Sequence, residues 1–154
     1  MPDSSAAKGL HAIMAADKNF DARHFIDGAR AAYEMTVTAY AEGDRRALQN
    51  LLAPEIYEGF EAAIREREAR GETAETRFIS IDATVITAAE LRGKKAQITL
   101  RFVSQLVSAT RDRNGNVIDG SADNAPSVTD VWTFTRDVTS YDLNWKLVAT
   151  EAGA

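Results

Sequence analysis

The stretch QITLRFVSQLVSA, residues 97–109, decides the fold. Apolar and polar residues alternate along it, which is the period of a β-strand that has one buried face and one wet face. The apolar set is Ile98, Leu100, Phe102 and Leu106, and the polar set is Gln97, Thr99, Arg101 and Gln105. We therefore expect this stretch to be a strand of an antiparallel sheet.

Three further segments show the same period of two. The turn LRGKK, with Gly93 at its centre, joins residues 77–90 to residues 97–109 as a hairpin. Residues 128–137 predict another strand, and residues 145–149 supply the last one. Residues at alternate positions share one face of each segment. In residues 77–90 they are Ile79, Ile81, Ala83 and Val85, in residues 128–137 they are Asp130, Trp132 and Phe134, and in residues 145–149 they are Trp145, Leu147 and Ala149. We expect a meandering sheet of about four strands.

Turn residues dominate between the second and third of these strands. Asn114-Gly115 is the dipeptide that most readily adopts the positive φ angles of a type I′ turn, and DGSADNAPS, residues 119–127, is typical of a loop. Oxygen-bearing side chains in this region invite a calcium interpretation: Asp112, Asn114, Asn116 and Asp119. The spacing fails, because Gly115 stands at the fourth position of the run and a calcium loop has its glycine at the sixth. We expect a hairpin turn and no metal site.

Before Gly71 the apolar residues follow the helical period. Asp21 can accept the free N–H groups of a first turn, and Gly43 closes the helix that follows. Asp44 offers a second N-cap, and Pro54 suits the first position of a helix that runs to Gly71. The apolar faces consist of Phe25, Ala29, Ala32, Tyr33, Val37 and Tyr40; then Leu48, Leu51 and Leu52; then Ile56, Phe60, Ala63 and Ile64.

Helices followed by antiparallel strands predict one α+β domain in which the helices cover one face of the sheet. Residues 1–19 carry only a short apolar stripe, formed by Leu10, Ile13 and Met14, which is too short to be stable alone. We expect residues 1–19 to be a weakly structured leader or docking helix and residues 20–154 to form the domain.

Composition excludes several classes of function. The 154 residues are 45% apolar and 27% charged, which is typical of a globular chain. The net charge of −5 opposes binding to phosphate backbones, so nucleic acid is not an expected partner. With no Cys and two His, the chain has neither a thiol nucleophile nor the ligands of a typical zinc site, and no cofactor is expected.

Four blocks, in this order and at this spacing, resemble the C-terminal domain of the Tim44 family. They are FIDGARAAYEMTVTAYAEGD (25–44), LLAPEIYEGFEAAIREREARGE (51–72), SATRDRNGNVIDG (108–120) and VTDVWTFTRDVTSYDLNWKLVAT (128–150). The family includes the peripheral adaptor of the mitochondrial import motor and its alphaproteobacterial TimA-type relatives. The resemblance implies a cone-shaped fold like that of nuclear transport factor two, with helices packed across a strongly curved sheet and an apolar cavity between them.

The resemblance also implies a function. It points to a noncatalytic, membrane-proximal adaptor domain whose cavity holds a lipid tail or an apolar segment of a membrane protein. A chaperone or translocase partner and a place at the cytoplasmic side of a bacterial inner membrane are implied in the same way. The candidate cavity-lining residues are Tyr33, Tyr40, Phe60, Ile64, Phe102, Asp130, Trp132 and Phe134. Large apolar side chains at regular spacing are also typical of plain core, and that interpretation stays open.

Two alternatives are weighed beside this one. The cone fold also hosts isomerases and dehydratases, and Asp130 could act as a general base if burial on the apolar strand face raised its pKa, with Tyr33 or Tyr57 donating to an oxyanion. In the alternative interpretation Asp130 has a structural role and pairs with an Arg or with backbone N–H groups. Neither His11 nor His24 is placed to assist. The second alternative is a weak homodimer through the polar face of residues 97–109.

Overall fold

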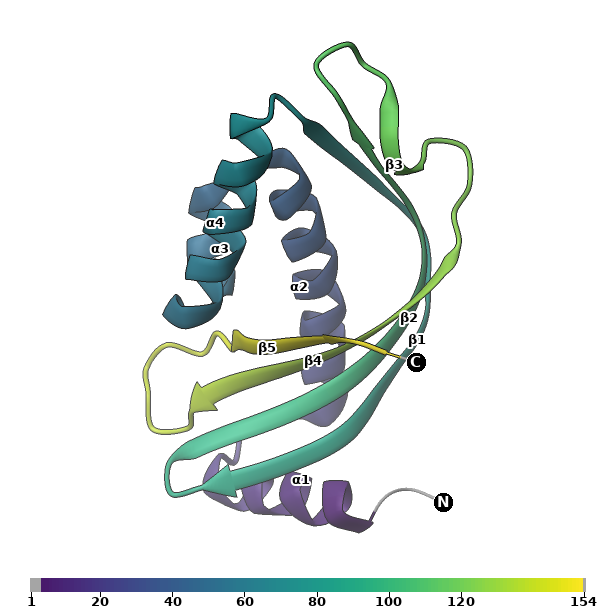
Figure 1. The fold of residues 1–154 in the computed structure, drawn as a ribbon. Helices are drawn as coiled ribbons and strands as arrows, with labels where there is room; N and C mark the ends of the chain where they lie inside the picture. Colours follow the sequence, from purple (N-terminus) through teal and green to yellow (C-terminus); the bar gives the residue numbers. More distant parts are fainter. Residues whose placement is uncertain (1–3, 154) are drawn as a thin grey trace.

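Helices occupy the first half of the chain and strands the second half, which confirms the α+β class (Figure 1). The structure, a computed structural model, describes residues 4–153. Its helices are α1 (Ser4–Ala16), α2 (Ala22–Glu42), α3 (Arg45–Leu51) and α4 (Pro54–Ala69). Its strands are β1 (Thr73–Arg92), β2 (Lys95–Arg111), β3 (Val117–Ser121), β4 (Ser127–Asp137) and β5 (Lys146–Ala152).

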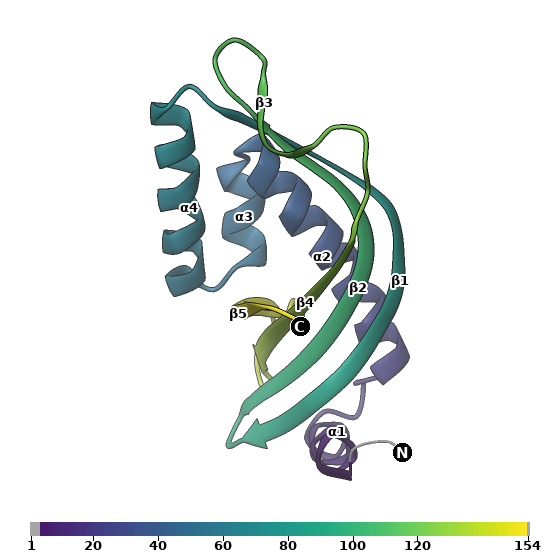
Figure 2. The same cartoon turned by 45° about the vertical axis from the view of Figure 1, so that its right-hand side comes forward.

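The sheet is antiparallel, strongly curved and unclosed (Figures 1 and 2). Its order is β1-β2-β4-β5, and β3 pairs with the far end of β2. The hairpin at Gly93 is confirmed, since Arg92 pairs with Lys95 across it. The alternation in β2 is confirmed as well: its four predicted apolar residues are all buried, and Arg101 is exposed. That this curvature amounts to a cone like that of nuclear transport factor two stays a prediction.

In β1 the predicted parity is wrong. Ile79 and Val85 share the predicted face with Ile81, yet their side chains are 51% and 43% exposed. Register shifts interrupt the pairing with β2 at three places, between Phe78 and Ser80, Ile81 and Ala83, and Ile86 and Ala88. Each bulge inserts one extra residue and therefore moves the following side chains to the opposite face. Phe78, Ile81 and Ile86 pack against the core instead.

The turn after β2 lies where it was predicted, but its type differs. Among residues 4–153 only glycines have positive φ, so Asn114 does not take the left-handed conformation that a type I′ turn needs. Gly115 does, at φ 83°. The Asp112 carboxylate accepts the backbone N–H groups of Asn114 and Asn116 at 2.9 and 3.0 Å. The result is a three-residue turn ending in a left-handed glycine.

The expectation of about four strands misses β3. Residues 119–121, which the turn-rich composition assigns to a loop, belong to this strand, and Ser121 pairs with Ser108. The side chains of β3 are almost all exposed. A strand held by backbone pairing alone carries no buried apolar face, so no alternation in the sequence could reveal it.

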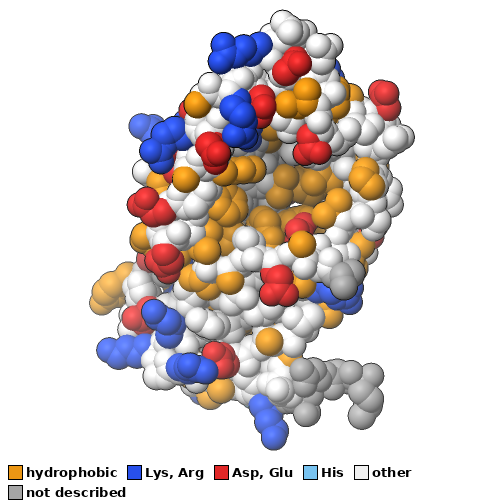
Figure 3. Space-filling model, viewed as in Figure 1, with side chains coloured by type: hydrophobic (Ala, Val, Ile, Leu, Met, Phe, Trp, Pro, Cys, Tyr) orange, Lys and Arg blue, Asp and Glu red, His pale blue; other side chains and the backbone are white. Residues whose placement is uncertain are grey.

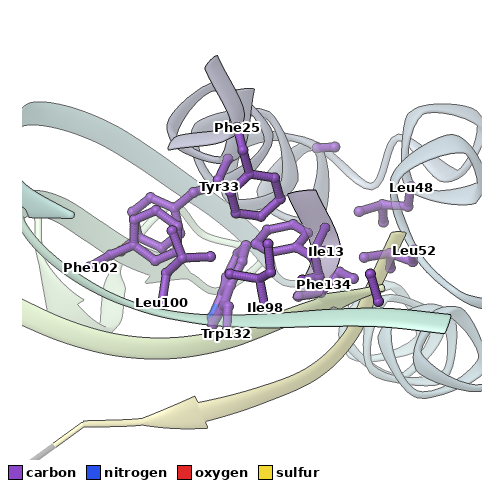
Figure 4. Close-up of a cluster of buried hydrophobic side chains, with 14 of the residues drawn as sticks. Ile13, Phe25, Tyr33, Leu48, Leu52, Ile98, Leu100, Phe102, Trp132 and Phe134 are labelled. Atoms are coloured by element: carbon purple, nitrogen blue, oxygen red, sulfur yellow. The ribbon is translucent and has the colours of Figure 1, made fainter. Parts of the chain in front are cut away.

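The helix boundaries follow from their caps. The Asp21 side chain accepts the N–H of Arg23, and Gly43 ends α2 in the left-handed conformation, as predicted. Asp44 caps α3, and Pro54 is the first residue of α4. The core lies between α2 and the concave face of the sheet (Figure 4). Its largest members include Phe25, Tyr33, Ile98, Leu100, Phe102, Trp132, Phe134 and Leu147.

Helix α1 packs against β1 close to the β1–β2 hairpin (Figures 1 and 2). Ile13 is fully buried, and Asp17 after the helix forms an ion pair with the buried Arg136 of β4 at 3.0 Å. A Cβ atom at Gly9 would overlap the carbonyl oxygen of Ala89, so the helix and strand backbones approach too closely for any side chain. Of the expected leader, residues 1–3 lie outside the described residues, as does residue 154 of the domain.

We predict opposite effects for the same substitution at two helical glycines. Gly28→Ala in α2 meets open space and should raise the free energy of unfolding by about 0.5–1 kcal/mol through helix propensity. Gly9→Ala should lower it by about 1–3 kcal/mol because the added methyl group forces α1 away from β1. Urea unfolding of both variants checks this. A stabilised Gly9→Ala variant would contradict the close packing of α1.

Candidate functional site

A cleft of about 370 Å³ opens between the helices and the end of the sheet. It is visible in Figure 3 as a hollow with hydrophobic side chains on its walls. Helices α2 and α4 form one side, and strands β4 and β5 form the other. The lining residues are Thr36, Val37, Tyr40, Gly59, Phe60, Ala63, Asp130, Trp132, Thr150, Glu151 and Ala152.

Helix α4 is held by the fully buried Ile64 and by its polar flank. Arg45 Nε lies 2.7 Å from Glu61 Oε2, and Arg45 Nη2 lies 2.8 Å from Glu68 Oε1, which ties α3 to α4. These hydrogen bonds from Arg45 hold the pKa of both glutamates below the usual range. Arg67 donates to the carbonyl oxygens of Tyr40 and Ala41, at 2.8 and 3.1 Å, at the end of α2. Held in this way, α4 leaves room between itself and β4.

Two aromatic rings in the walls of the cleft pack edge to face. The rings of Tyr40 and Phe60 join α2 to α4 with their centroids 5.2 Å apart and their planes at 71°. The guanidinium of Arg67 lies over the Tyr40 ring at 5.3 Å, which fixes its orientation. Trp132 forms part of the opposite wall and is otherwise buried.

Asp130 is the acidic side chain that connects the cleft to the core. Its Oδ2 accepts a hydrogen bond of 2.6 Å from the hydroxyl of Tyr33, which also lies 3.0 Å from Ser104 Oγ. Tyr33 and Ser104 are fully buried, while Asp130 is half-buried. Burial, and then the hydrogen bond to Asp130, raise the pKa of the Tyr33 hydroxyl well above its usual range. The proton therefore stays on Tyr33 at physiological pH.

Aromatic packing fixes Tyr33 in place. Its ring stacks on Phe102 with a centroid distance of 4.3 Å and an interplanar angle of 2° (Figure 4). Trp132 and Phe78 meet the same ring edge on, at 4.7 and 5.5 Å. Because α2, β1, β2 and β4 all contribute to this cluster, the hydroxyl is held rigidly toward Asp130.

The eight candidate cavity residues separate into two groups. Four line the cleft: Tyr40, Phe60, Asp130 and Trp132. The other four are buried in the core, namely Tyr33, Ile64, Phe102 and Phe134, and Phe134 also lines a second hollow. Sequence reasoning left out the remaining residues of the cleft. The helical spacing places Val37 and Ala63 on the same apolar faces as Tyr40 and Phe60 without assigning them to a cavity, whereas no pattern marks residues 150–152.

A second hollow, of about 790 Å³, lies beside the first half of α2. The loop of residues 138–145 forms its other wall, where Tyr141 and Leu143 are exposed. The buried Arg136 holds this loop by donating to the carbonyl oxygens of Ser140 and Asp142, both at 3.2 Å. His24 lines this hollow, whereas Asp130 lines the cleft.

Residues 4–153 contain no group of three or more His, Asp or Glu side chains that could hold a metal ion. None of the helices between residues 4 and 153 combines the length and the hydropathy that a bilayer-crossing helix requires.

Comparison with known proteins gives a family and two relatives. The family model described as Tim44-like domain matches residues 6–152. A probable mitochondrial import inner membrane translocase subunit, tin-44 of Caenorhabditis elegans, is 22% identical over 86% of this chain and 32% of its own length. The mitochondrial import inner membrane translocase subunit TIM44-1 of Arabidopsis thaliana is 21% identical over 86% of this chain and 28% of its own length. The chain thus spans about a third of these relatives.

Among solved structures, the intermembrane space region of the chloroplast protein ARC6 has a similar fold. Its TM-score is 0.56 at 13% sequence identity, and the match covers 87% of this chain and 97% of that one. At this identity the likeness concerns the fold alone.

Tyr33→Phe should lower the free energy of unfolding by about 1–3 kcal/mol at neutral pH, because Asp130 loses its donor. The Tyr33 pKa is higher in the folded chain than in the unfolded chain, so its contribution is complete below about pH 10 and is lost as pH rises further. The difference between the native chain and Tyr33→Phe should therefore be constant up to about pH 10 and shrink as the pH rises above that value.

Urea unfolding across this pH range measures the difference. Tyr141→Phe is the matched control, since the Tyr141 side chain is fully exposed and should give no such change. A Tyr33→Phe difference that is independent of pH would contradict the buried hydroxyl.

Proposed function

The chain belongs to the Tim44-like domain family, and from this we propose that it is a noncatalytic binding domain of a membrane-proximal protein-transport adaptor. Its cleft would hold an apolar segment of a partner protein or a lipid tail. We place it at the cytoplasmic side of a bacterial inner membrane. The two curated relatives support the transport role, because both are named as subunits of a mitochondrial import inner membrane translocase.

The cleft is the observation that carries this proposal. Tyr40, Phe60 and Trp132 present apolar surface to a hollow of about 370 Å³. Each Å² of apolar surface that a ligand removes from water contributes about 25 cal/mol, so an apolar chain that fills the hollow would bind favourably. Pockets of this size, with apolar walls and few polar groups, are typical of ligand sites.

A translocase or chaperone is the class of partner that the family favours. The names of the two relatives refer to whole proteins about three times as long as the matched part. We therefore propose the partner by class and assign no residue of this chain to a chaperone contact. A weak homodimer through the polar face of β2 stays a prediction.

The enzyme alternative is less well supported by the geometry. A general base needs a free carboxylate and a nearby acid that can give up a proton in the reaction. Here the proposed acid, Tyr33, already donates its proton to Asp130 and is sealed in the core. The other candidate, Tyr57, is absent from the residues that line the cleft. Asp130 and Tyr33 thus form a structural pair, which favours binding over catalysis.

A bromine-labelled fatty acid tests whether an apolar chain occupies the cleft. In a Trp145→Phe background, Trp132 is the remaining tryptophan and reports from the cleft wall. We expect 9,10-dibromostearate, or an apolar peptide with 4-bromophenylalanine, to quench its fluorescence in a saturable manner. Gly59→Leu should weaken this binding about tenfold or more, because the new side chain enters the open cleft.

Gly28→Leu is the matched control. Gly28 is also an exposed helical glycine with open space around its Cβ position, but it borders the second hollow. It should leave the quenching unchanged. The proposal fails if neither probe quenches Trp132, or if Gly59→Leu and Gly28→Leu behave alike.

A further inference from the structure

Strand β5 has a free edge. It stands last in the sheet order, and within residues 4–153 no strand pairs with its outer side. The N–H of Gly153 donates to the carbonyl oxygen of Thr129 at 2.8 Å, so these two residues form a hydrogen-bonded pair. From this pair onward, non-hydrogen-bonded and hydrogen-bonded pairs alternate along β4 and β5. Glu151 therefore turns its backbone groups toward β4, and Thr150 and Ala152 turn theirs away.

This edge borders the cleft. Thr150 and Ala152 line it together with Phe60 of α4 on the opposite side. Only the start of β5 is covered, where Ala53 N–H donates to the carbonyl oxygen of Leu147 at 2.9 Å. Figures 1 and 3 show β5 below α4 and the hollow between them. A row of backbone donors and acceptors thus faces an apolar space, which is a template for an added strand.

The cleft also holds a negative charge that lacks a counterion. None of the ion pairs within residues 4–153 includes Asp130. One of its carboxylate oxygens accepts from Tyr33, and in the described part of the chain the other has no hydrogen-bond partner. A half-buried carboxylate is stabilised by a cation, and a ligand could supply one.

Ala152 leaves the way from the edge to Asp130 open. These two residues are directly opposite in the register and form a pair without mutual backbone hydrogen bonds, so their side chains lie close together on one face. A strand added to β5 would lie two strand spacings, about 10 Å, from β4. A long side chain on that strand, passing over the methyl group of Ala152, can approach the carboxylate.

We propose that the cleft takes an extended segment of a partner protein that adds to β5 as a further strand. Its backbone pairs with Thr150 and Ala152, an apolar side chain packs against Tyr40 and Phe60, and a Lys or Arg side chain reaches Asp130. This inference rests on the proposed function and names the chemistry of the ligand. A lipid tail would leave the strand edge unpaired, and its anionic headgroup would meet the charge of Asp130.

Three fluorescein-labelled peptides of nine residues test the two recognition elements separately. The first alternates Val and Thr around a central Lys, the second has norleucine in place of Lys, and the third is the Lys peptide with alternate backbone nitrogens methylated. Fluorescence anisotropy with the full chain should show the first binding most tightly. The loss of the cation and the loss of backbone donors should each weaken binding about tenfold.

Three variants assign the effects to residues. Asp130→Asn should abolish the preference for Lys over norleucine, and Tyr33→Phe, which keeps the Asp130 charge, should retain it. Ala152→Pro removes an edge donor without touching the carboxylate, and proline is tolerated at a strand edge. This variant should weaken the binding of the Lys peptide and of the norleucine peptide by the same factor, of about five or more.

The outcomes separate this inference from the proposed function. Quenching of Trp132 by dibromostearate without binding of the peptides would overturn the strand addition and leave an apolar cleft. Failure of all probes would overturn both. Equal affinity for the Lys and norleucine peptides, or an unchanged Lys preference in Asp130→Asn, would overturn the role of Asp130.

Discussion

The stack of Tyr33 on Phe102 is the contact on which the arrangement of helix and sheet depends. The two rings lie parallel with their centroids 4.3 Å apart, and the Tyr33 hydroxyl reaches over to Asp130 on the neighbouring strand. One side chain of α2 therefore fixes the helix to both β2 and β4. Because the ring is fully buried and its hydroxyl is satisfied, it contributes apolar burial without the penalty of an unpaired polar atom. It also sets the position of Asp130 at the boundary between core and cleft.

The hollow beside this core results from how α4 is held. Arg45 and Arg67 hold α4 through its charged flank and through the end of α2. The fourth helix therefore borders the sheet at β5 and leaves space above Trp132. A binding domain benefits from this geometry, since apolar side chains that would otherwise complete the core stay available to a ligand. The curved, unclosed sheet has the same consequence, because within the described residues 4–153 no strand pairs with the outer edge of β5 beside the apolar wall.

Much of the fold could be predicted from the sequence, because it follows from local patterns. The alternation from Ile98 to Phe102 predicts a buried strand face, and the caps Asp21 and Gly43 predict the bounds of α2. The predictions fail at two places. The bulges in β1 depend on how two long strands curve together, so parity placed Ile79 on the wrong face. The turn at Asn114 differs because the Asp112 carboxylate, rather than a second left-handed residue, satisfies its N–H groups.

The sequence by itself determined the elements that carry a buried apolar face, their order and the family, since caps, periods and the spacing within the quoted blocks are properties of neighbouring residues. Only the tertiary structure decided which aromatic side chains form core and which form a wall. Tyr33 and Tyr40 have the same spacing pattern on one helix, yet Tyr33 is sealed by Phe102 and Tyr40 faces the cleft. The difference depends on the separation between α4 and the sheet. Contacts between residues distant in the sequence hold α4 against α2 and α3, among them the Arg45–Glu61 ion pair and the hydrogen bond from Arg67 to the carbonyl oxygen of Tyr40, and no local sequence pattern predicts them.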